Sequence, residues 1–174
     1  YQLQIEGVTN EDIEAANKFI KDSKDYLDKI VELPIIVENT GIEKRQGTRE
    51  LDVKTLQPGT KLNYVLDTSA ENFTREEIKK VFQEAGTIFV NAVMGYTALY
   101  PEGSMAMYSL IGQCPKAIKL FGGGDTIQDF KEYLPGIFAK AQNDQSYYFF
   151  TGGGAILDAI QQGSPYGMKP VQMI

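Results

Sequence analysis

Two glycine triplets are the segments of this chain best suited to chemistry. Gly122–Gly124 follows the apolar run AIKLF, and Gly152–Gly154 follows the apolar run YYFF and one threonine. Glycines at the end of a strand let the backbone come close to a ligand. The start of the next helix then offers unpaired N–H groups with a partial positive charge. Each triplet therefore predicts a site for an anion such as phosphate.

Asp125 and Thr126 add a carboxylate and a hydroxyl to the first triplet. At a helix entrance, these side chains either cap the helix or reach a magnesium ion attached to phosphate. Both triplets also have a purely structural interpretation, as a capped glycine turn and as tight packing of a helix on a strand. Neither is a P-loop, because no Gly-Lys-Ser/Thr follows, and neither has the G-x-G-x-x-G spacing of a dinucleotide site.

The composition narrows the range of functions. The 174 residues include no histidine and a single cysteine, Cys114, so catalysis would rest on carboxylates, lysines, backbone amides or a metal. The net charge of −6, with acids and bases mixed, argues against nucleic acid or an anionic membrane as the main partner. No run approaches the roughly 18 apolar residues that a membrane span needs. We expect a cytoplasmic protein with a reduced thiol and, because no long exposed apolar patch is evident, a monomer.

Helical and strand patterns alternate along the chain. Thr9 with Asp12 and Thr74 with Glu77 have the spacing of capping boxes. Helices are predicted at 10–31, 74–86 and 103–113, with strands at 33–37, 61–67, 87–92, 117–121 and 147–150, and an edge strand or hairpin near 51–55. This alternation predicts an α/β fold: a doubly wound, Rossmann-like, mainly parallel sheet with helices on both faces, in three α/β/α layers. Right-handed crossovers would bring both glycine triplets to one edge of that sheet.

Several segments, taken in order, resemble the carboxy-terminal, nucleotide-binding domain of phosphoglycerate kinase. In that family the corresponding motifs run W-N-G-P-M-G, then G-G-G-D-T/S, then S/T-G-G-G-A. The matching segments here are VNAVMGY (90–96), KLFGGGDT (119–126) and FFTGGGAILDAI (149–160). LPIIV (33–37), LNYVLD (62–67) and MKPVQMI (168–174) extend the resemblance over nearly the whole chain.

The resemblance implies a reversible, Mg²⁺-dependent transfer of a phosphoryl group between 1,3-bisphosphoglycerate and ADP, which yields ATP in glycolysis. It also implies roles for the two triplets. The nucleotide phosphates would lie at Gly122, Gly123, Gly124, Asp125 and Thr126, with Mg²⁺ at Asp125, and the phosphoryl group in transfer at Gly152, Gly153 and Gly154. Residues 1–174 would be a single nucleotide-binding domain of a two-domain kinase. Its phosphoglycerate-binding domain would precede Tyr1, so the isolated chain is expected to be inactive.

Departures from the family pattern leave a second hypothesis open. Val90 replaces the tryptophan, Ala92 and Val93 replace the Gly-Pro pair, and Ala98 replaces the glutamate that holds the ribose. Glu102 is the nearest carboxylate that could take the place of this glutamate, and its simpler interpretation is a solvated loop charge. The alternative is therefore a degenerate, non-catalytic nucleotide-binding or scaffold module of the same fold. An unrelated nucleotide-binding α/β domain is a third.

Other charged and aromatic residues have plainer interpretations. Lys119 either faces the phosphate or points away from it, and the charges around Glu43–Arg45 and Arg49 are expected on a solvated loop. The aromatic rings of 147–150 are expected in the core.

Overall fold

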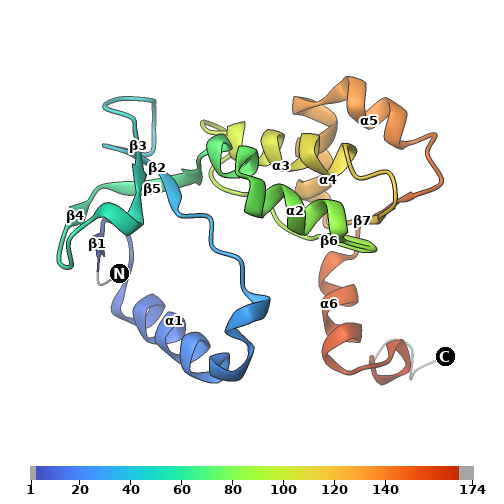
Figure 1. Ribbon diagram of the computed structural model, residues 1–174, viewed down its shortest axis with the longest axis horizontal. Helices are drawn as coiled ribbons and strands as arrows, with labels where there is room; N and C mark the ends of the chain where they lie inside the picture. The colour runs from blue at the N-terminus through green and yellow to red at the C-terminus, as the bar shows by residue number, and fades with distance from the viewer. Residues whose placement is uncertain (1–2, 169–174) are drawn as a thin grey trace.

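The computed structural model describes residues 3–168, whose elements are shown in chain order in Figure 1. The carboxy-terminal match MKPVQMI lies outside the described residues except for Met168. The first helix, α1 (Asn10–Asp22), begins at the predicted capping box, in which Thr9 Oγ1 accepts the Asp12 N–H and the Asp12 side chain accepts the Thr9 N–H. It ends earlier than predicted, at the cap residue Ser23, which has φ −89° and ψ 5°. The 3₁₀ turns that follow (η1, Lys24–Lys29) are interrupted at Tyr26, which has a non-helical φ of −130°.

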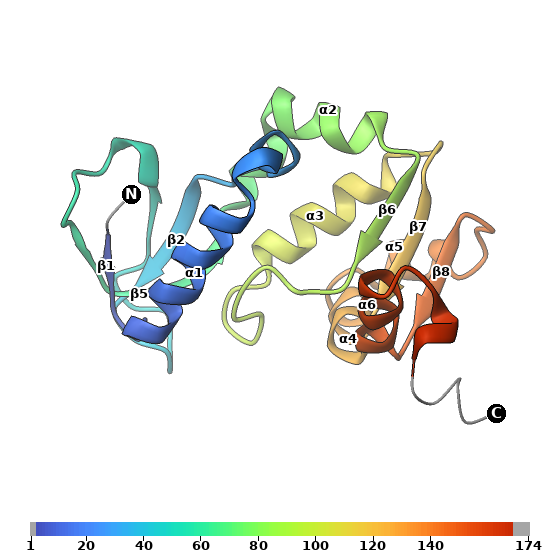
Figure 2. The same ribbon diagram turned by 90° about the horizontal axis from the view of Figure 1, so that it is seen from below.

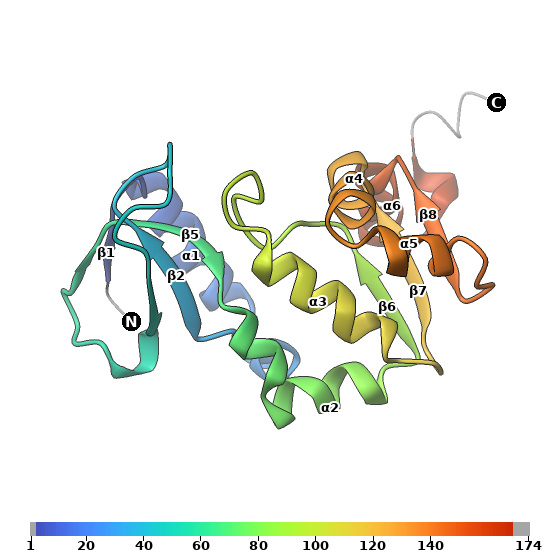
Figure 3. The same ribbon diagram turned by 90° about the horizontal axis from the view of Figure 1, so that it is seen from above.

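Three parallel strands form the sheet that carries the glycine triplets. They pair in the order β6-β7-β8 and are β6 (Thr87–Val90), β7 (Ile118–Gly122) and β8 (Tyr147–Phe150). In Figures 2 and 3, α6 (Gly153–Gln161) lies on one face of this sheet, and α3 (Glu102–Gly112), α4 (Gly124–Tyr133) and α5 (Pro135–Ala141) lie on the other. This is a three-layer α/β/α arrangement, and it confirms the predicted Rossmann-like α/β class.

The earlier strands pair differently from the prediction. An antiparallel sheet in the order β3-β2-β5 is formed by β2 (Ile35–Asn39), β3 (Arg49–Asp52) and β5 (Tyr64–Thr68), and a short parallel ladder by β1 (Gln4–Ile5) and β4 (Lys61–Leu62). Parallel neighbours need a long crossover connection, usually a helix. Residues 40–48 instead form a loop, and η2 (Val53–Thr55) and β4 are the elements between β3 and β5. The predicted edge strand or hairpin near 51–55 is confirmed in part, because β3 includes Leu51 and Asp52 and pairs antiparallel with β2, whereas Val53–Thr55 form η2.

The second predicted capping box is absent from the structure. A 3₁₀ segment, η3 (Ala70–Thr74), ends at Thr74, and α2 (Glu76–Glu84) begins after Arg75 with no side-chain cap. The helix itself lies where the apolar spacing placed it, so the apolar stripe predicted the element and the polar spacing did not predict its start.

The core beside the parallel sheet is aromatic. Phe121 is fully buried, and its ring lies 4.9–6.0 Å, centroid to centroid, from the rings of Tyr108, Phe130, Tyr147 and Phe149. Tyr147 and Phe149 thus confirm the expectation that residues 147–150 supply core rings, whereas Tyr148 is exposed.

Two reactive side chains are buried near the start of β7. Lys119 Nζ donates to Ala117 O and Ser146 Oγ, both at 3.0 Å, and lies 4.8 Å from the centre of the Tyr147 ring. Lys119 therefore points away from the glycine turn at the other end of its strand. The Cys114 Sγ donates to Leu110 O, and burial raises the pKa of this thiol.

Helix α1 contributes no buried residue, and its apolar side chains Phe19 and Ile20 are each 58% exposed. The expectation that no apolar patch is exposed is therefore wrong for this helix. Within residues 3–168, no helix has the length and apolar character needed to cross a membrane.

We predict that the stability of this chain depends on the ring cluster and not on α1. Phe121→Ala removes a fully buried ring and should lower the free energy of unfolding by about 3–5 kcal/mol. The matched change Phe19→Ala removes an exposed ring and should alter it by less than about 0.5 kcal/mol. Urea denaturation of both variants measures the difference. Equal losses would show that α1 is as important to the fold as the core.

Candidate functional site

The two glycine triplets lie side by side. In the parallel register of β7 and β8, Gly122 is opposite Phe150, and the Gly123 N–H donates to Phe150 O at 2.8 Å. A Cβ atom placed on Gly122 would lie 3.3 Å from Gly153 Cα. The structure thus brings the predicted residues of both triplets to one edge of one sheet, while their roles in binding and catalysis stay predictions.

Only some of these glycines are required by packing. A Cβ atom on Gly153 would lie 1.8 Å from Asn91 Oδ1 and 2.8 Å from Gly123 N, and Gly123 itself has a φ of 94°. These two positions need glycine for steric reasons. Gly124 and Gly154 have nothing within 4 Å of an added Cβ atom, and both are exposed. Packing therefore explains why Gly123 and Gly153 are glycine, but it does not explain Gly124 and Gly154.

Asn91 is the residue of this site that the sequence analysis missed. It directly follows β6, and its side chain lies among both glycine turns, since added Cβ atoms on Gly122 and Gly123 would each be 3.1 Å from its Oδ1. The signal was present in the chain, because a polar residue after a strand of a parallel sheet lies at the same edge as the other strand ends. Asn91 therefore supplies an amide group at the point where the turns meet.

The helix starts at the two turns have no side-chain caps. Helix α4 begins after Gly123 and α6 after Gly152, and neither has a side-chain hydrogen bond at its cap. Asp125 and Thr126 therefore do not cap α4. The Asp125 side chain is exposed in the first turn of α4, and Thr126 is 3% exposed. In α6 the Ala155 N–H donates to Gly152 O, so the N–H groups of Gly153 and Gly154, together with those of the first turn of α4, are the ones available to an anion.

Asp125 is the carboxylate that this edge offers to a cation. Residues 3–168 contain no group of three or more His, Cys, Asp and Glu side chains able to hold a metal by themselves. Mg²⁺ is usually held by one or two carboxylates together with substrate phosphates and water. One exposed carboxylate beside two anion-binding helix starts fits an ion that arrives with a phosphate chain.

A second candidate region lies along the loop from β6 to α3. A pocket of about 370 Å³ is lined by residues from β5 and from this loop: Val65, Leu66, Asp67, Thr68, Met94, Gly95 and Tyr96. Asp67 is 4% exposed, and burial raises its pKa from 3.8 to about 6. The pocket combines apolar walls with one buried carboxyl group.

Glu102 and Arg45 are paired with each other and are not free loop charges. Arg45 Nη2 donates to both Glu102 carboxylate oxygens at 2.5 and 2.7 Å and to Leu99 O at 2.6 Å, and its guanidinium lies 4.5 Å from the Tyr100 ring centre. Arg49 is similarly paired with Glu38, which is 1% exposed. Arg45 and Arg49 are thus exposed, as the solvated-loop interpretation predicted, but both are paired, and Arg49 lies at the start of β3. Glu102 is exposed as well, and its carboxylate is paired with Arg45.

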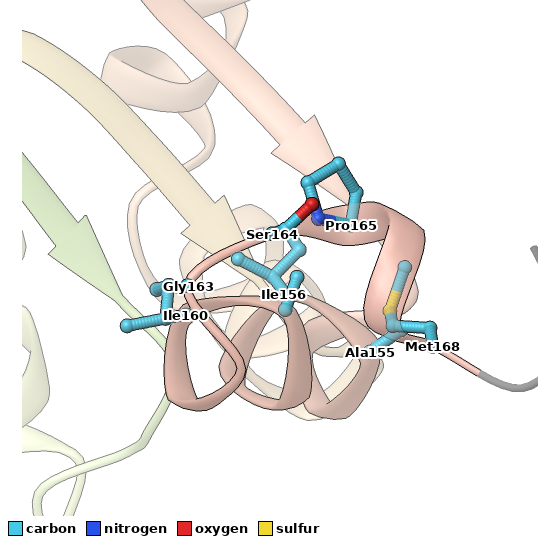
Figure 4. A pocket seen from close by; sticks show the side chains of 8 residues that line it. Ala155, Ile156, Ile160, Gly163, Ser164, Pro165 and Met168 are labelled. Carbon is cyan, nitrogen blue, oxygen red and sulfur yellow. The ribbon is translucent and has the colours of Figure 1, made fainter.

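A different pocket lies between α6 and the segment that follows it, residues 163–168, and is shown in Figure 4. It measures about 470 Å³ and is lined by apolar and small residues: Ala155, Ile156, Ala159, Ile160, Gly163, Ser164, Pro165 and Met168. Without a charged lining residue, it does not suit a phosphate chain.

The family model for phosphoglycerate kinase matches residues 1–163. The chain belongs to the phosphoglycerate kinase family. It is 32% identical over 92 residues to the phosphoglycerate kinase of Chlamydia pneumoniae, a match covering 52% of this chain and 21% of that protein. To the phosphoglycerate kinase of Thermus thermophilus it is 28% identical over 101 residues, covering 57% and 24%.

A solved structure shows the same fold. The phosphoglycerate kinase of Coxiella burnetii superposes with a TM-score of 0.67 at 17% identity, over 90% of this chain and 38% of that one. The matched segments span only about a fifth to a quarter of the length of the curated phosphoglycerate kinases just named.

We predict that the two triplets differ in their tolerance of a methyl group. Gly153→Ala should lower the free energy of unfolding by about 1–3 kcal/mol, because its Cβ atom meets Asn91 and the backbone of Gly123. Gly154→Ala should leave it unchanged or raise it by up to about 1 kcal/mol, since its Cβ atom enters open space and alanine favours the helix. Urea denaturation measures both, and the Asn91 side-chain amide resonance should shift only in the first variant. The same loss in both variants would argue against close contact between the turns.

Proposed function

We propose that this chain is the carboxy-terminal, nucleotide-binding domain of a phosphoglycerate kinase. In the complete protein it would take part in Mg²⁺-dependent phosphoryl transfer between 1,3-bisphosphoglycerate and ADP. The observation that carries this proposal is the contact of two uncapped glycine turns at one sheet edge, with Asn91 between them. Family membership supports the reaction class.

The residues divide the work between holding the nucleotide and stabilising the transferred group. Gly122–Gly124 and Thr126 would bind nucleotide phosphates through the start of α4, and Asp125 would hold Mg²⁺. The ion supplies positive charge that offsets the charge of the phosphate oxygens. The N–H groups of Gly152–Gly154 would bind the phosphoryl oxygens, where negative charge must be stabilised during transfer. Such a mechanism needs positioned donors and no histidine.

The pocket beside Asp67 offers a place for the nucleoside. Asn91 and Met94 are three residues apart along one loop, so at most about 11 Å of chain separates the glycine turns from this pocket. A nucleotide with its phosphates at the turns therefore has an apolar pocket within reach for its base.

One observation favours the non-catalytic alternative. Ala98 has no carboxylate for a ribose, and Glu102 is held by Arg45. If the nucleotide depends on such a contact, the chain would keep the fold and the glycine turns as a binding or scaffold module. The kinase proposal itself also includes three further points: a partner domain that binds phosphoglycerate, a cytoplasmic location and a monomeric state.

The test is a titration of the 174-residue chain with Mg²⁺–ADP followed by NMR. We expect weak binding with shifts at Gly122–Thr126 and Gly152–Gly154, and Asp125→Asn should weaken it about tenfold, because the variant loses a ligand of the ion. Glu132→Gln removes the same charge from the exposed far end of α4 and should leave the affinity unchanged.

Equal loss in the two variants would contradict the role of Asp125 and point to overall charge. The absence of shifts around the two triplets at millimolar nucleotide would favour the scaffold alternative.

A further inference from the structure

Asp67 reaches from the end of one strand to the start of a distant helix. It lies in β5 and is 4% exposed, and its Oδ2 accepts the Gly103 N–H at 2.9 Å while its Oδ1 accepts the Thr68 N–H at 2.8 Å. Gly103 is in the first turn of α3, whose own cap residue, Pro101, makes no side-chain cap bond. The Asp67 carboxylate therefore takes the place of a cap and lies at the positive end of α3.

Two glycines let this carboxylate approach both sides of the β6–α3 loop. A Cβ atom on Gly103 would be 2.4 Å from Asp67 Oδ1, and one on Gly95 would be 2.8 Å from the same atom and 2.2 Å from Leu66 O. The next residue, Tyr96, donates its N–H to Leu66 O at 2.7 Å. The end of β5 therefore contacts the β6–α3 loop at Gly95 and Tyr96 and the start of α3 at Gly103 (Figure 3).

The same loop carries Asn91 to the glycine turns. After Asn91 the chain is fixed at Met94, whose N–H donates to Ser104 Oγ at 2.9 Å, and then at Gly95 and Tyr96 on β5. Near the end of the loop, Arg45 binds Leu99 O. Asp67 is the buried ionisable group at the centre of these attachments.

We propose that Asp67 is a positioning residue for Asn91: its carboxylate fixes the β6–α3 loop against β5 and makes the position of Asn91 between the glycine turns depend on pH. The consequence for nucleotide affinity rests on the function proposed above, whereas the coupling of Asp67 to Asn91 does not.

The surroundings of Asp67 make its charge depend on pH. The pKa of Asp67 is raised from 3.8 to about 6. Burial is the main cause and Glu102 in α3 adds to it, while the N–H groups of Gly103 and Thr68 and the charge of Arg45 oppose the rise. Because the folded-state pKa is above its ordinary value, the fold binds the proton more tightly than the unfolded chain. The stabilising contribution of Asp67 is therefore complete below pH 3.8 and is lost as pH rises through about 6. At neutral pH, where Asp67 is charged, its raised pKa therefore adds nothing to the free energy of unfolding.

The coupling is tested by an NMR pH titration of the 174-residue chain without nucleotide. In the unmodified chain, the backbone amides of Gly103 and Gly95 and both amides of Asn91 should titrate with one midpoint near pH 6. Asp67→Asn should abolish this step at all three residues. Titration of Gly103 without Asn91, or a step at Asn91 that persists in Asp67→Asn, would overturn the proposal.

Two further variants keep the test decisive. Glu38→Gln removes another buried carboxylate, in β2 beside β5, which accepts hydrogen bonds from Arg49 and Asn63. This variant should leave the midpoint near pH 6. Arg45→Gln leaves Asp67 in place but removes the opposing charge and frees Glu102, so it should raise the midpoint. If Asp67→Asn does not fold, an unchanged midpoint in Arg45→Gln contradicts the proposal.

Measurement of the affinity for Mg²⁺–ADP at two pH values tests this inference separately from the proposed function. The affinity for Mg²⁺–ADP should fall severalfold more between pH 7.5 and 5.5 in the unmodified chain than in Asp67→Asn, since the titration of the phosphates is common to both. Failure of ADP to bind at any pH would remove the proposed function and leave the Asn91 titration to decide the positioning role. Identical pH profiles in both chains, with the nucleotide bound, would overturn the consequence for affinity.

Discussion

The parallel pairing of β7 with β8 is the interaction on which the candidate site depends. The register that places Gly122 opposite Phe150 makes both strands end at the same level, and the Gly123 N–H bond to Phe150 O joins one turn to the other strand. Helices α4 and α6 then leave for opposite faces of the sheet from neighbouring points (Figures 2 and 3). A shift of one residue would exchange the faces of every side chain in β8 and separate the turns.

The two glycine turns follow strand residues that are held by packing. Phe121 and Phe149, in the ring cluster, come shortly before the two triplets, so the residues that lead into each turn are fixed by packing. Glycine residues without such packing would lose more conformational entropy when a ligand binds. The contact of Gly153 with Asn91 limits this freedom further, while Gly154 and Gly124 stay open.

The sequence predicted the parts of the fold in which short-range pattern and topology agree. Strands that alternate with helices led to the parallel sheet, and the glycine triplets at its edge followed from the handedness of the crossovers. The antiparallel pairing of β2 was missed because an apolar run specifies a strand and not its neighbour. The pairing of Arg45 was missed because its partners, Leu99 and Glu102, lie more than fifty residues away. The place of Asn91 at this edge could have been predicted, because Asn91 directly follows a strand of the parallel sheet. Its close contact with Gly153 depends on three strand ends at once, and no local pattern encodes that contact.

The burial of Cys114 has a practical consequence for work on this chain. Its thiol is 3% exposed, donates to Leu110 O and has a raised pKa, so little of it is present as the reactive thiolate at neutral pH. A cysteine introduced on the surface would then accept a fluorophore or spin label selectively in the folded protein. Distances between chosen points on the loop and the sheet become measurable with the natural residue left in place.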